Sequence, residues 1–254
     1  MKVVALSSGS KGNCYYVETS KNKILLDAGR NYTYIKDKLA EIDVSIKDID
    51  YIIISHTHTD HIAALKSFIA KGKVTVVITA KMAAQIPELI EYPKLYEYEN
   101  DINLDGIIID SFRSSHDAID SRNFIIDDNG IKLGYITDTG YINNRNFKKL
   151  YNLNMYLFES NHDIEMLQHG PYPDWLKRRV LSDEGHLSNN ISAFYLTKLI
   201  GPNTEKVMLI HLSETNNLPD VALKTLKSTL KEYNIDFKNI EVALQNERSE
   251  VTEI

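Results

Sequence analysis

Ser55-His56-Thr57-His58-Thr59-Asp60-His61 contains three of the chain's eight histidines. The apolar run at 51–54 before it predicts a short buried strand. The apolar spacing at 62–69 after it predicts an amphipathic helix. The histidines therefore lie where a strand ends and a helix begins.

The four acidic and imidazole side chains of this stretch are expected to face one space. Residues two apart on an extended segment point to the same side, so His56 and His58 lie together. Asp60 and His61 follow on the turn or the first helical turn and point back toward them. Side chains of this kind at a strand tip are typical ligands of divalent metal ions. A purely structural role is disfavoured, because burial of these polar groups would cost desolvation free energy that nothing offsets.

Composition and charge place the chain among ordinary globular proteins. It has 254 residues, of which 43% are hydrophobic and 25% charged, enough for one large α/β domain. We expect a single domain over 1–254, with a frayed tail at 247–254. The net charge of −6 argues against a surface coated in basic residues, but it leaves a local basic strip open.

The single cysteine and the N-terminal residues bear on the compartment. Cys14 alone excludes an internal disulfide framework and is typical of a reducing cytoplasm, so we expect a cytoplasmic protein with Cys14 buried in packing. No apolar run reaches the roughly 20 residues that span a bilayer. The apolar residues near the N-terminus end at Leu6, before the polar Ser7, so this run is too short for the apolar region of a signal peptide. We therefore expect no membrane partner.

The remaining pattern predicts strands and helices that alternate at both ends of the chain. Strands are expected at 3–6, 15–18, 23–27, 49–55, 74–79, 106–110, 123–127, 132–137, 155–159, 206–211 and 242–245. Helices are expected at 31–41, 62–70, 161–168, 174–181, 187–199 and 219–232. This arrangement indicates two sheets packed face to face with helices outside.

Three further residues of the ligand type each follow an apolar strand: His116, Asp138 and His211. Singly, each would more often be an ordinary loop residue. Together with the first cluster they complete seven ligands, which suits two metal ions with open coordination positions.

The series His56-x-His58-x-Asp60-His61, His116, Asp138 and His211 resembles the metallo-β-lactamase superfamily of hydrolases. The resemblance implies a four-layer αββα sandwich with two divalent metal ions at one edge. It implies one metal on His56, His58 and His116, a second on Asp60, His61 and His211, and Asp138 as the bridge. An Asp bridge is usual in members that cut phosphodiesters, and it accommodates zinc or manganese.

Four further segments, 7–14, 159–163, 185–189 and 211–217, resemble the YycJ/WalJ-type bacterial metallohydrolases. That similarity implies a DNA exonuclease that works on double-stranded ends in the 5′-to-3′ direction. RNase Z is a more distant relative. The alternatives are a phosphodiesterase for a small cyclic nucleotide, an RNase Z-like RNA nuclease, and a non-catalytic binding module. The oligomeric state stays open, with a homodimer among the alternatives.

Three residues are candidates for the chemistry itself: Asp60, Glu159 and His186. Two cations roughly 3.5–4 Å apart can hold a hydroxide and clamp a phosphate oxygen. His186 would then protonate the leaving oxygen, and Glu159 would orient His186. The alternative for His186 is a structural role at the start of a helix. His162 either contacts substrate or caps a helix.

One basic segment has an aromatic neighbour, in Trp175-Leu176-Lys177-Arg178-Arg179. Lys177, Arg178 and Arg179 are candidates for contacts with DNA phosphates, and Trp175 is a candidate for stacking on a base. The alternative is a solvated helix face with Trp175 packed beneath it.

Overall fold

The computed structural model describes all of residues 1–254 and divides into two compact units. Unit 1 comprises Met1–Phe112, Ala118–Arg122 and Leu244–Ile254, and unit 2 comprises Arg113–Asp117 and Asn123–Ala243. The expected single domain stays a prediction. None of the helices combines the length and the apolar character that a membrane crossing needs.

The sheet of unit 1 orders its strands β14-β1-β2-β3-β4-β5-β6. Their bounds are β1 (Lys2–Ser7), β2 (Cys14–Glu18), β3 (Lys23–Leu26), β4 (Tyr51–Ile53), β5 (Thr75–Thr79), β6 (Leu95–Tyr98) and β14 (Thr252–Glu253). β1, β2 and β3 pair antiparallel, whereas β3, β4, β5 and β6 pair parallel. The carboxyl ends of β3 and β4 therefore lie at the same edge, where the histidine-rich stretch begins.

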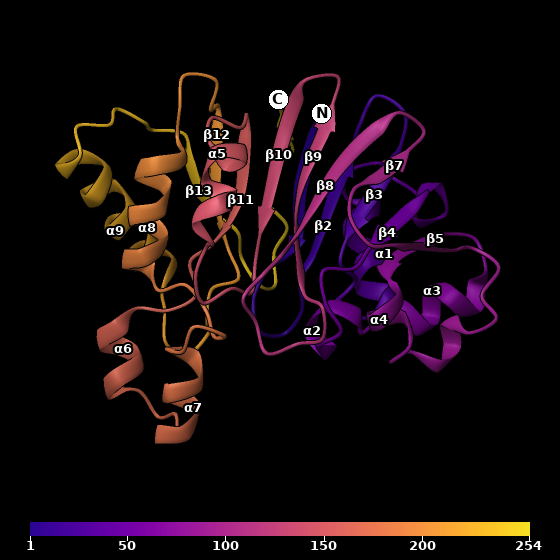
Figure 1. The fold of residues 1–254 in the computed structure, drawn as a ribbon, viewed down its shortest axis with the longest axis horizontal. Coiled ribbons are helices and arrows are strands. Elements are labelled where there is room, and N and C mark those ends of the chain that lie inside the picture. Colours follow the sequence, from indigo (N-terminus) through magenta and orange to yellow (C-terminus); the bar gives the residue numbers. More distant parts are fainter. The chain divides into compact units, whose positions relative to one another are not determined.

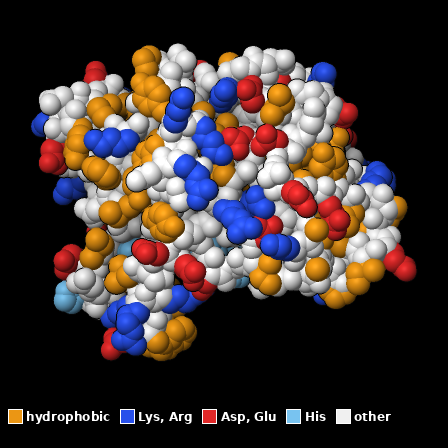
Figure 2. Space-filling model, in the orientation of Figure 1, with side chains coloured by type: hydrophobic (Ala, Val, Ile, Leu, Met, Phe, Trp, Pro, Cys, Tyr) orange, Lys and Arg blue, Asp and Glu red, His pale blue; other side chains and the backbone are white.

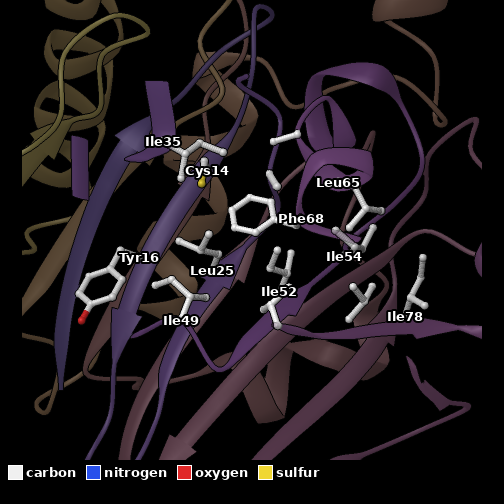
Figure 3. Packing of buried hydrophobic residues seen from close by; sticks show 14 of the residues in the cluster. Cys14, Tyr16, Leu25, Ile35, Ile49, Ile52, Ile54, Leu65, Phe68 and Ile78 are labelled. Atoms are coloured by element: carbon white, nitrogen blue, oxygen red, sulfur yellow. The ribbon is translucent and has the colours of Figure 1, made fainter. Parts of the chain in front are cut away.

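Helices cover one face of this sheet and close a hydrophobic core (Figure 3). Leu25, Ile52 and Ile54 point from the strands toward Ile35 and Phe68 of the helices. Residues two apart on a strand share a face, which explains why Ile52 and Ile54 enter the same core. The helices of unit 1 are α1 (Tyr32–Ala40), α2 (Thr59–Ile62), α3 (Leu65–Lys71) and α4 (Ala80–Ala83), with 3-10 turns η1 (Ile46–Asp48) and η2 (Pro87–Leu89).

The last residues of the chain form an ordered edge of unit 1. β14 pairs antiparallel with β1, the Ser249 amide donates to Ala5 O at 2.9 Å, and the Ala5 amide donates to Ser249 Oγ at 3.0 Å. The predicted fraying of 247–254 is therefore wrong. An unpaired β1 would expose a row of backbone donors and acceptors, and the tail satisfies them. Its polar sequence gives no sign of this partner.

Unit 2 is built on five strands in the order β13-β12-β11-β10-β9. Their bounds are β9 (Arg122–Asp128), β10 (Ile131–Ile136), β11 (Met155–Glu159), β12 (Lys206–Ile210) and β13 (Ile240–Val242). β9 and β10 form an antiparallel hairpin, and β10 to β13 pair parallel. The segments that leave β10, β11 and β12 therefore start at one edge, where Asp138, Glu159 and His211 are found.

The helices of unit 2 fall into two groups (Figure 1). α8 (Asn189–Leu199) and α9 (Pro219–Glu232) pack on each other beside β12 and β13. α6 (Ile164–His169) and α7 (Asp174–Val180) are short and lie on the connection between β11 and α8. The remaining short elements are η3 (Asn144–Asn146) and α5 (Phe147–Leu150).

The expected elements are found within a few residues of their predicted places, and several short elements were not expected, among them α4, α5 and β14. β6 was not expected, because Pro87 and Pro93 interrupt the pattern before it. The hairpin of β7 (Ile102–Leu104) with β8 (Ile107–Arg113) extends a single predicted strand into two. Cys14 is fully buried in the core, as predicted.

Candidate active site

The segment after β4 gathers the four ligand-type side chains of unit 1. The ring centroid of His56 lies 4.7 Å from that of His58 and 4.0 Å from that of His61. His61 Nε2 lies 3.5 Å from Asp60 Oδ2. His58 is the N-cap residue of α2, so the short helix turns Asp60 and His61 back toward the strand end. The sequence predicted that His56 and His58 lie together from side-chain alternation, and that Asp60 and His61 point back toward them from the turn or the first helical turn.

Asp27 is a buried residue of this cluster that the sequence analysis missed. Its buried carboxylate accepts hydrogen bonds from the Ser55 amide, from Ser55 Oγ and from His61 Nδ1, each at 2.7 Å. Because Asp27 holds Nδ1, Nε2 of His61 is left as the nitrogen that can bind a cation. The signal was present in the sequence, since Asp27 follows a buried strand just as His56 does.

Asn13 is a second residue that the sequence analysis missed. Its side-chain Nδ2 lies 3.1 Å from His61 Nε2 and 3.4 Å from Asp60 Oδ2. The Asn13 amide donates to Asp60 O at 2.7 Å, which fixes the loop against α2. This approach requires Gly29, because a Cβ there would lie 1.6 Å from Asp60 O. The sequence analysis used segment 7–14 as a family motif but gave Asn13 no role of its own.

A second cluster lies in unit 2, at the ends of β10, β11 and β12. One ligand atom from each of Asp138, Glu159, His186 and His211 lies within 4.8 Å of the others. Glu159 Oε1 accepts from His186 Nδ1 at 2.8 Å and from His211 Nδ1 at 3.0 Å. His116 joins this group, with its Nε2 at 3.6 Å from Asp138 Oδ1. The parallel pairing of the three strands brings these distant residues together.

Glu159 is the electrostatic centre of the second cluster. Burial alone would raise the pKa of its carboxyl group. The charge of His186 and the hydrogen bonds from His186 and His211 outweigh burial and lower this pKa below its ordinary value. The ionised carboxylate accepts hydrogen bonds only, so both Nδ1 atoms are donors. The predicted pairing of Glu159 with His186 is therefore present in the structure.

The sequence suggested that His186 lies at the start of a helix, but in the structure it does not. α8 starts at Asn189, and Ser188 is its N-cap, accepting from the Ile191 amide. His186 lies in the preceding loop and its side chain is 14% exposed, whereas that of Glu159 is fully buried. Nδ1 of His186 thus donates a hydrogen bond to the buried carboxylate of Glu159, while the ring stays partly accessible to solvent.

The backbone is strained at the residues that leave three strands. Asp27, Asp138 and His211 have positive φ values of 58°, 46° and 56°. Residues other than glycine adopt this conformation seldom, and such strain gathers at functional sites. Each of the three turns its side chain just beyond the end of a strand.

His162 is buried and does not cap a helix. The N-cap of α6 is Asp163, whose side chain accepts from the Met166 amide at 2.9 Å, so the capping interpretation of His162 is wrong. Neither ring nitrogen of His162 has a hydrogen-bond partner, and the residue is 1% exposed. Burial, with the charge of His186, lowers its pKa to about 4. Its contact with substrate stays a prediction.

The predicted basic segment forms α7 and its surroundings, where Figure 2 shows Lys and Arg side chains beside hydrophobic atoms. Trp175 is 62% exposed, so the alternative that packed it beneath the helix is wrong. Lys177 Nζ donates to Gln168 O at 2.7 Å. Arg179 is paired with Asp117. α7 therefore presents an aromatic ring and positive charge on one exposed turn.

Both clusters have the donor chemistry that divalent cations require. Each combines imidazole with carboxylate, and each contains a buried carboxylate that holds a histidine by Nδ1. Such carboxylate–histidine pairs orient the ring and leave Nε2 to the metal. The residues of both units therefore fit divalent metal ions.

Comparison with known proteins agrees with this chemistry. A model of the Metallo-beta-lactamase superfamily matches residues 8–128. The chain is 37% identical to Exodeoxyribonuclease WalJ of Streptococcus pneumoniae serotype 2, over 93% of this chain and 92% of that protein. It is 36% identical to Exodeoxyribonuclease YycJ of Bacillus anthracis, over 89% and 88%. The crystal structure of the metallo-beta-lactamase fold protein YhfI from Bacillus subtilis has a TM-score of 0.75 at 15% identity, over 98% of this chain and 99% of that one.

The fold and the clusters define a metallohydrolase, and the predicted αββα class is confirmed. The chain belongs to the metallo-β-lactamase superfamily, in the family that includes WalJ and YycJ.

Proposed function

We propose that the protein is a metal-dependent exonuclease that degrades double-stranded DNA from its ends in the 5′-to-3′ direction. The observation that carries the proposal is the similarity to two exodeoxyribonucleases over nearly the whole length of the chain. The Asp138 cluster supports it, because an aspartate in this place suits phosphodiester hydrolysis. The direction of degradation follows from the resemblance of the sequence motifs.

We further propose that the protein holds two divalent cations, zinc or manganese. The support is the donor chemistry of each cluster and the family to which the chain belongs. When bound, the cations would supply positive charge for the phosphate and an activated water. The proposed ligands are His56, His58 and His116 for one ion, Asp60, His61 and His211 for the other, and Asp138 between them.

His186 is the proposed proton donor to the leaving oxygen. Glu159 holds its Nδ1 at 2.8 Å, so the other ring nitrogen is turned away from the buried carboxylate. The same carboxylate holds His211, which ties the position of the acid to that of a proposed ligand. Proton transfer of this kind contributes about 10²–10⁴-fold in rate.

The test is the product pattern on end-labelled duplex DNA with added Mn²⁺ or Zn²⁺. We expect short products from the 5′ end of linear DNA and none from closed circular DNA. His58→Ala in unit 1 and Asp138→Ala in unit 2 should each abolish hydrolysis while the protein stays folded. His169→Ala is the matched control, because His169 is an exposed histidine paired only with Glu165 on the same helix. Undiminished activity in both ligand variants would reject the assignment of the site.

A phosphodiesterase for a small cyclic nucleotide is the second candidate. The net charge of −6 favours a small substrate over a long polyanion. Cyclic nucleotides and structured RNA therefore belong in the same assay. Hydrolysis of a cyclic nucleotide with intact linear DNA would select this alternative, and cleavage of RNA alone would select an RNase Z-like activity.

A further inference from the structure

The guanidinium of Arg179 is engaged by a carboxylate of its own unit. Arg179 Nη2 donates to Asp117 Oδ1 at 2.8 Å, and Arg179 Nε donates to Asp117 Oδ2. This is the two-pronged geometry in which arginine binds a carboxylate most strongly. One edge of the guanidinium is thus held by a carboxylate, whereas Lys177 Nζ of the same helix donates to a backbone carbonyl, that of Gln168.

Asp117 connects this pair to His116, a proposed metal ligand. Asp117 Oδ1 lies 3.6 Å from His116 Nε2, and the two residues are adjacent in the chain. His116 Nδ1 lies 3.3 Å from its hydrogen-bond partner Gly185 O, and His116 Nε2 lies 3.6 Å from Asp138 Oδ1. Asp117 therefore lies beside the same ring nitrogen of His116, Nε2, that faces Asp138.

The last turn of α7 also supports the loop that carries His186. The His186 amide donates to Val180 O at 3.0 Å. A Cβ on Gly185 would lie 2.2 Å from Val180 O and 2.4 Å from Arg179 O. The backbone of the loop therefore packs against the C-terminal end of α7 with no room for a side chain at residue 185. The same helix end thus contacts the loop of His186 by its backbone and the loop of His116 through Arg179.

We propose that Arg179 is a positioning residue, which couples α7 to the metal ligand His116 through Asp117 and does not bind DNA phosphate itself. The inference rests on the proposed function, because it takes His116 as a ligand and α7 as a surface that contacts DNA. DNA held by Lys177 and Arg178 would then be fixed relative to the reacting centre by the same short helix. α7 would then both position a metal ligand and bind the DNA substrate.

The ion pair of Arg179 and Asp117 is expected to contribute little to the free energy of unfolding. The side chains of Arg179 and Asp117 are 42% and 29% exposed, and pairs of that exposure contribute little to stability. A role in positioning therefore predicts that removal of the pair changes metal binding and turnover without changing the unfolding temperature of the metal-free protein.

The experiment compares Arg179→Gln, Asp117→Asn and the double variant in the full chain. Mn²⁺ affinity is measured by competition with a chelator, and kcat and KM are measured on a chromogenic phosphodiester and on duplex DNA. We expect each single variant to lower Mn²⁺ affinity and kcat on both substrates by about tenfold, as for other residues that orient metal ligands. The double variant should be no worse than either single one, and Arg179→Lys should recover part of the loss.

Lys132→Gln is the matched control. Lys132 pairs with Asp127 at 3.4 Å and the side chains are 46% and 29% exposed, but Lys132 lies at the start of β10, whereas Asp138 follows its end. This variant should match the wild type in affinity and turnover.

Two results would overturn the inference. A higher KM for DNA alone in Arg179→Gln, with Asp117→Asn unchanged, would make Arg179 a phosphate contact. A lower unfolding temperature of the metal-free single variants that accounts for their loss of affinity would make the pair structural. If the wild type leaves DNA intact, the proposed function fails, and the Mn²⁺ affinities still decide the role of Arg179.

Discussion

Asp27 and Glu159 act on histidines in the same way, one in each unit. Asp27 holds His61 by Nδ1 at 2.7 Å, and Glu159 holds His186 and His211 by Nδ1 at 2.8 and 3.0 Å. Both carboxylates are fully buried. A buried carboxylate fixes the tautomer and the orientation of an imidazole ring, which prepares Nε2 for a cation or a proton.

The Asp27→Asn variant tests this role. Asparagine tolerates the positive φ of this position but offers no charge to His61, so we expect Mn²⁺ or Zn²⁺ affinity to fall by about 10–100-fold. Metal titration of the purified protein gives the value. Asp43→Asn is the control, because Asp43 is exposed and has the same φ of 58°. Equal affinity in the two variants would refute the role of Asp27.

His162 should make the protein sensitive to acid. Its pKa is about 4 in the folded protein, against an ordinary value of 6.5. Above pH 6.5 neither state is protonated, so the histidine has no effect. As the pH falls from 6.5 toward 4, the unfolded chain binds a proton that folded His162 does not, and stability is lost.

The expected loss between pH 7 and pH 5 is on the order of 2 kcal/mol. Urea unfolding at the two pH values measures it. In His162→Gln the pH dependence should flatten by this amount, whereas His169→Gln, which replaces an exposed histidine, should behave as the wild type. An identical pH dependence in the wild type and in His162→Gln would contradict the prediction.

At the residue scale, the sequence was sufficient to predict which histidines and aspartates lie just beyond the ends of strands. The alternation of His56 and His58 and the order of His116, Asp138 and His211 were sufficient for that. Asp27 was missed because only the parallel pairing of β3 with β4 brings it to His61. Asn13 was missed because its role depends on a close approach of two backbones.

Among the elements, α7 presents positive charge in a chain of negative net charge. Lys177 and Arg178 are carried on one helical turn next to the exposed Trp175. Contacts to phosphates displace counterions, so their contribution falls as salt rises. We therefore expect α7 to supply the local attraction for DNA that the overall charge of −6 does not.

The variant Lys177→Ala/Arg178→Ala should weaken cleavage of duplex DNA by about tenfold or more, and flatten its dependence on salt. Cleavage of a small chromogenic phosphodiester should stay unchanged, because that substrate does not reach α7. Initial rates at several salt concentrations measure both effects. Lys224→Ala/Lys227→Ala removes two exposed lysines from α9 and serves as the control. Equal losses on both substrates would remove α7 from the DNA-binding surface.

The boundaries of short elements were less predictable than their existence. The apolar periodicity of 187–199 predicted α8, but only the Ser188 side chain shows where the helix begins, and this places His186 in a loop. β6 and β14 lie in polar segments. Such edge strands are specified by their partners more than by their own residues, so a sequence pattern does not reveal them.

At the scale of the whole molecule, the two units are interleaved along the chain. Unit 1 is made of three separate segments, whereas nearly all of unit 2 is the continuous segment Asn123–Ala243. The final segment, Leu244–Ile254, returns to the sheet of unit 1 and pairs with its first strand. The integrity of unit 1 therefore depends on residues from both ends of the sequence.

Ser249→Ala tests this closure. The substitution leaves the buried Ala5 amide without its acceptor, which costs about 1–3 kcal/mol. We expect the free energy of unfolding to fall by that amount in urea titrations. Ser67→Ala is the control, since Ser67 is an exposed serine on α3 of the same unit and its loss should be neutral. Wild-type stability in Ser249→Ala would show that the tail adds nothing to unit 1.

The pairing of β14 with β1 also sets an order of events during translation. Lys2 and Val3 leave the ribosome well before their partners Glu253 and Thr252. Unit 2 can assemble on the nascent chain as soon as residue 243 has emerged, whereas the sheet of unit 1 keeps an open edge until residues 252 and 253 follow. A ribosome stalled between residues 243 and 252 would therefore hold a chain in which unit 2 is complete and unit 1 is not.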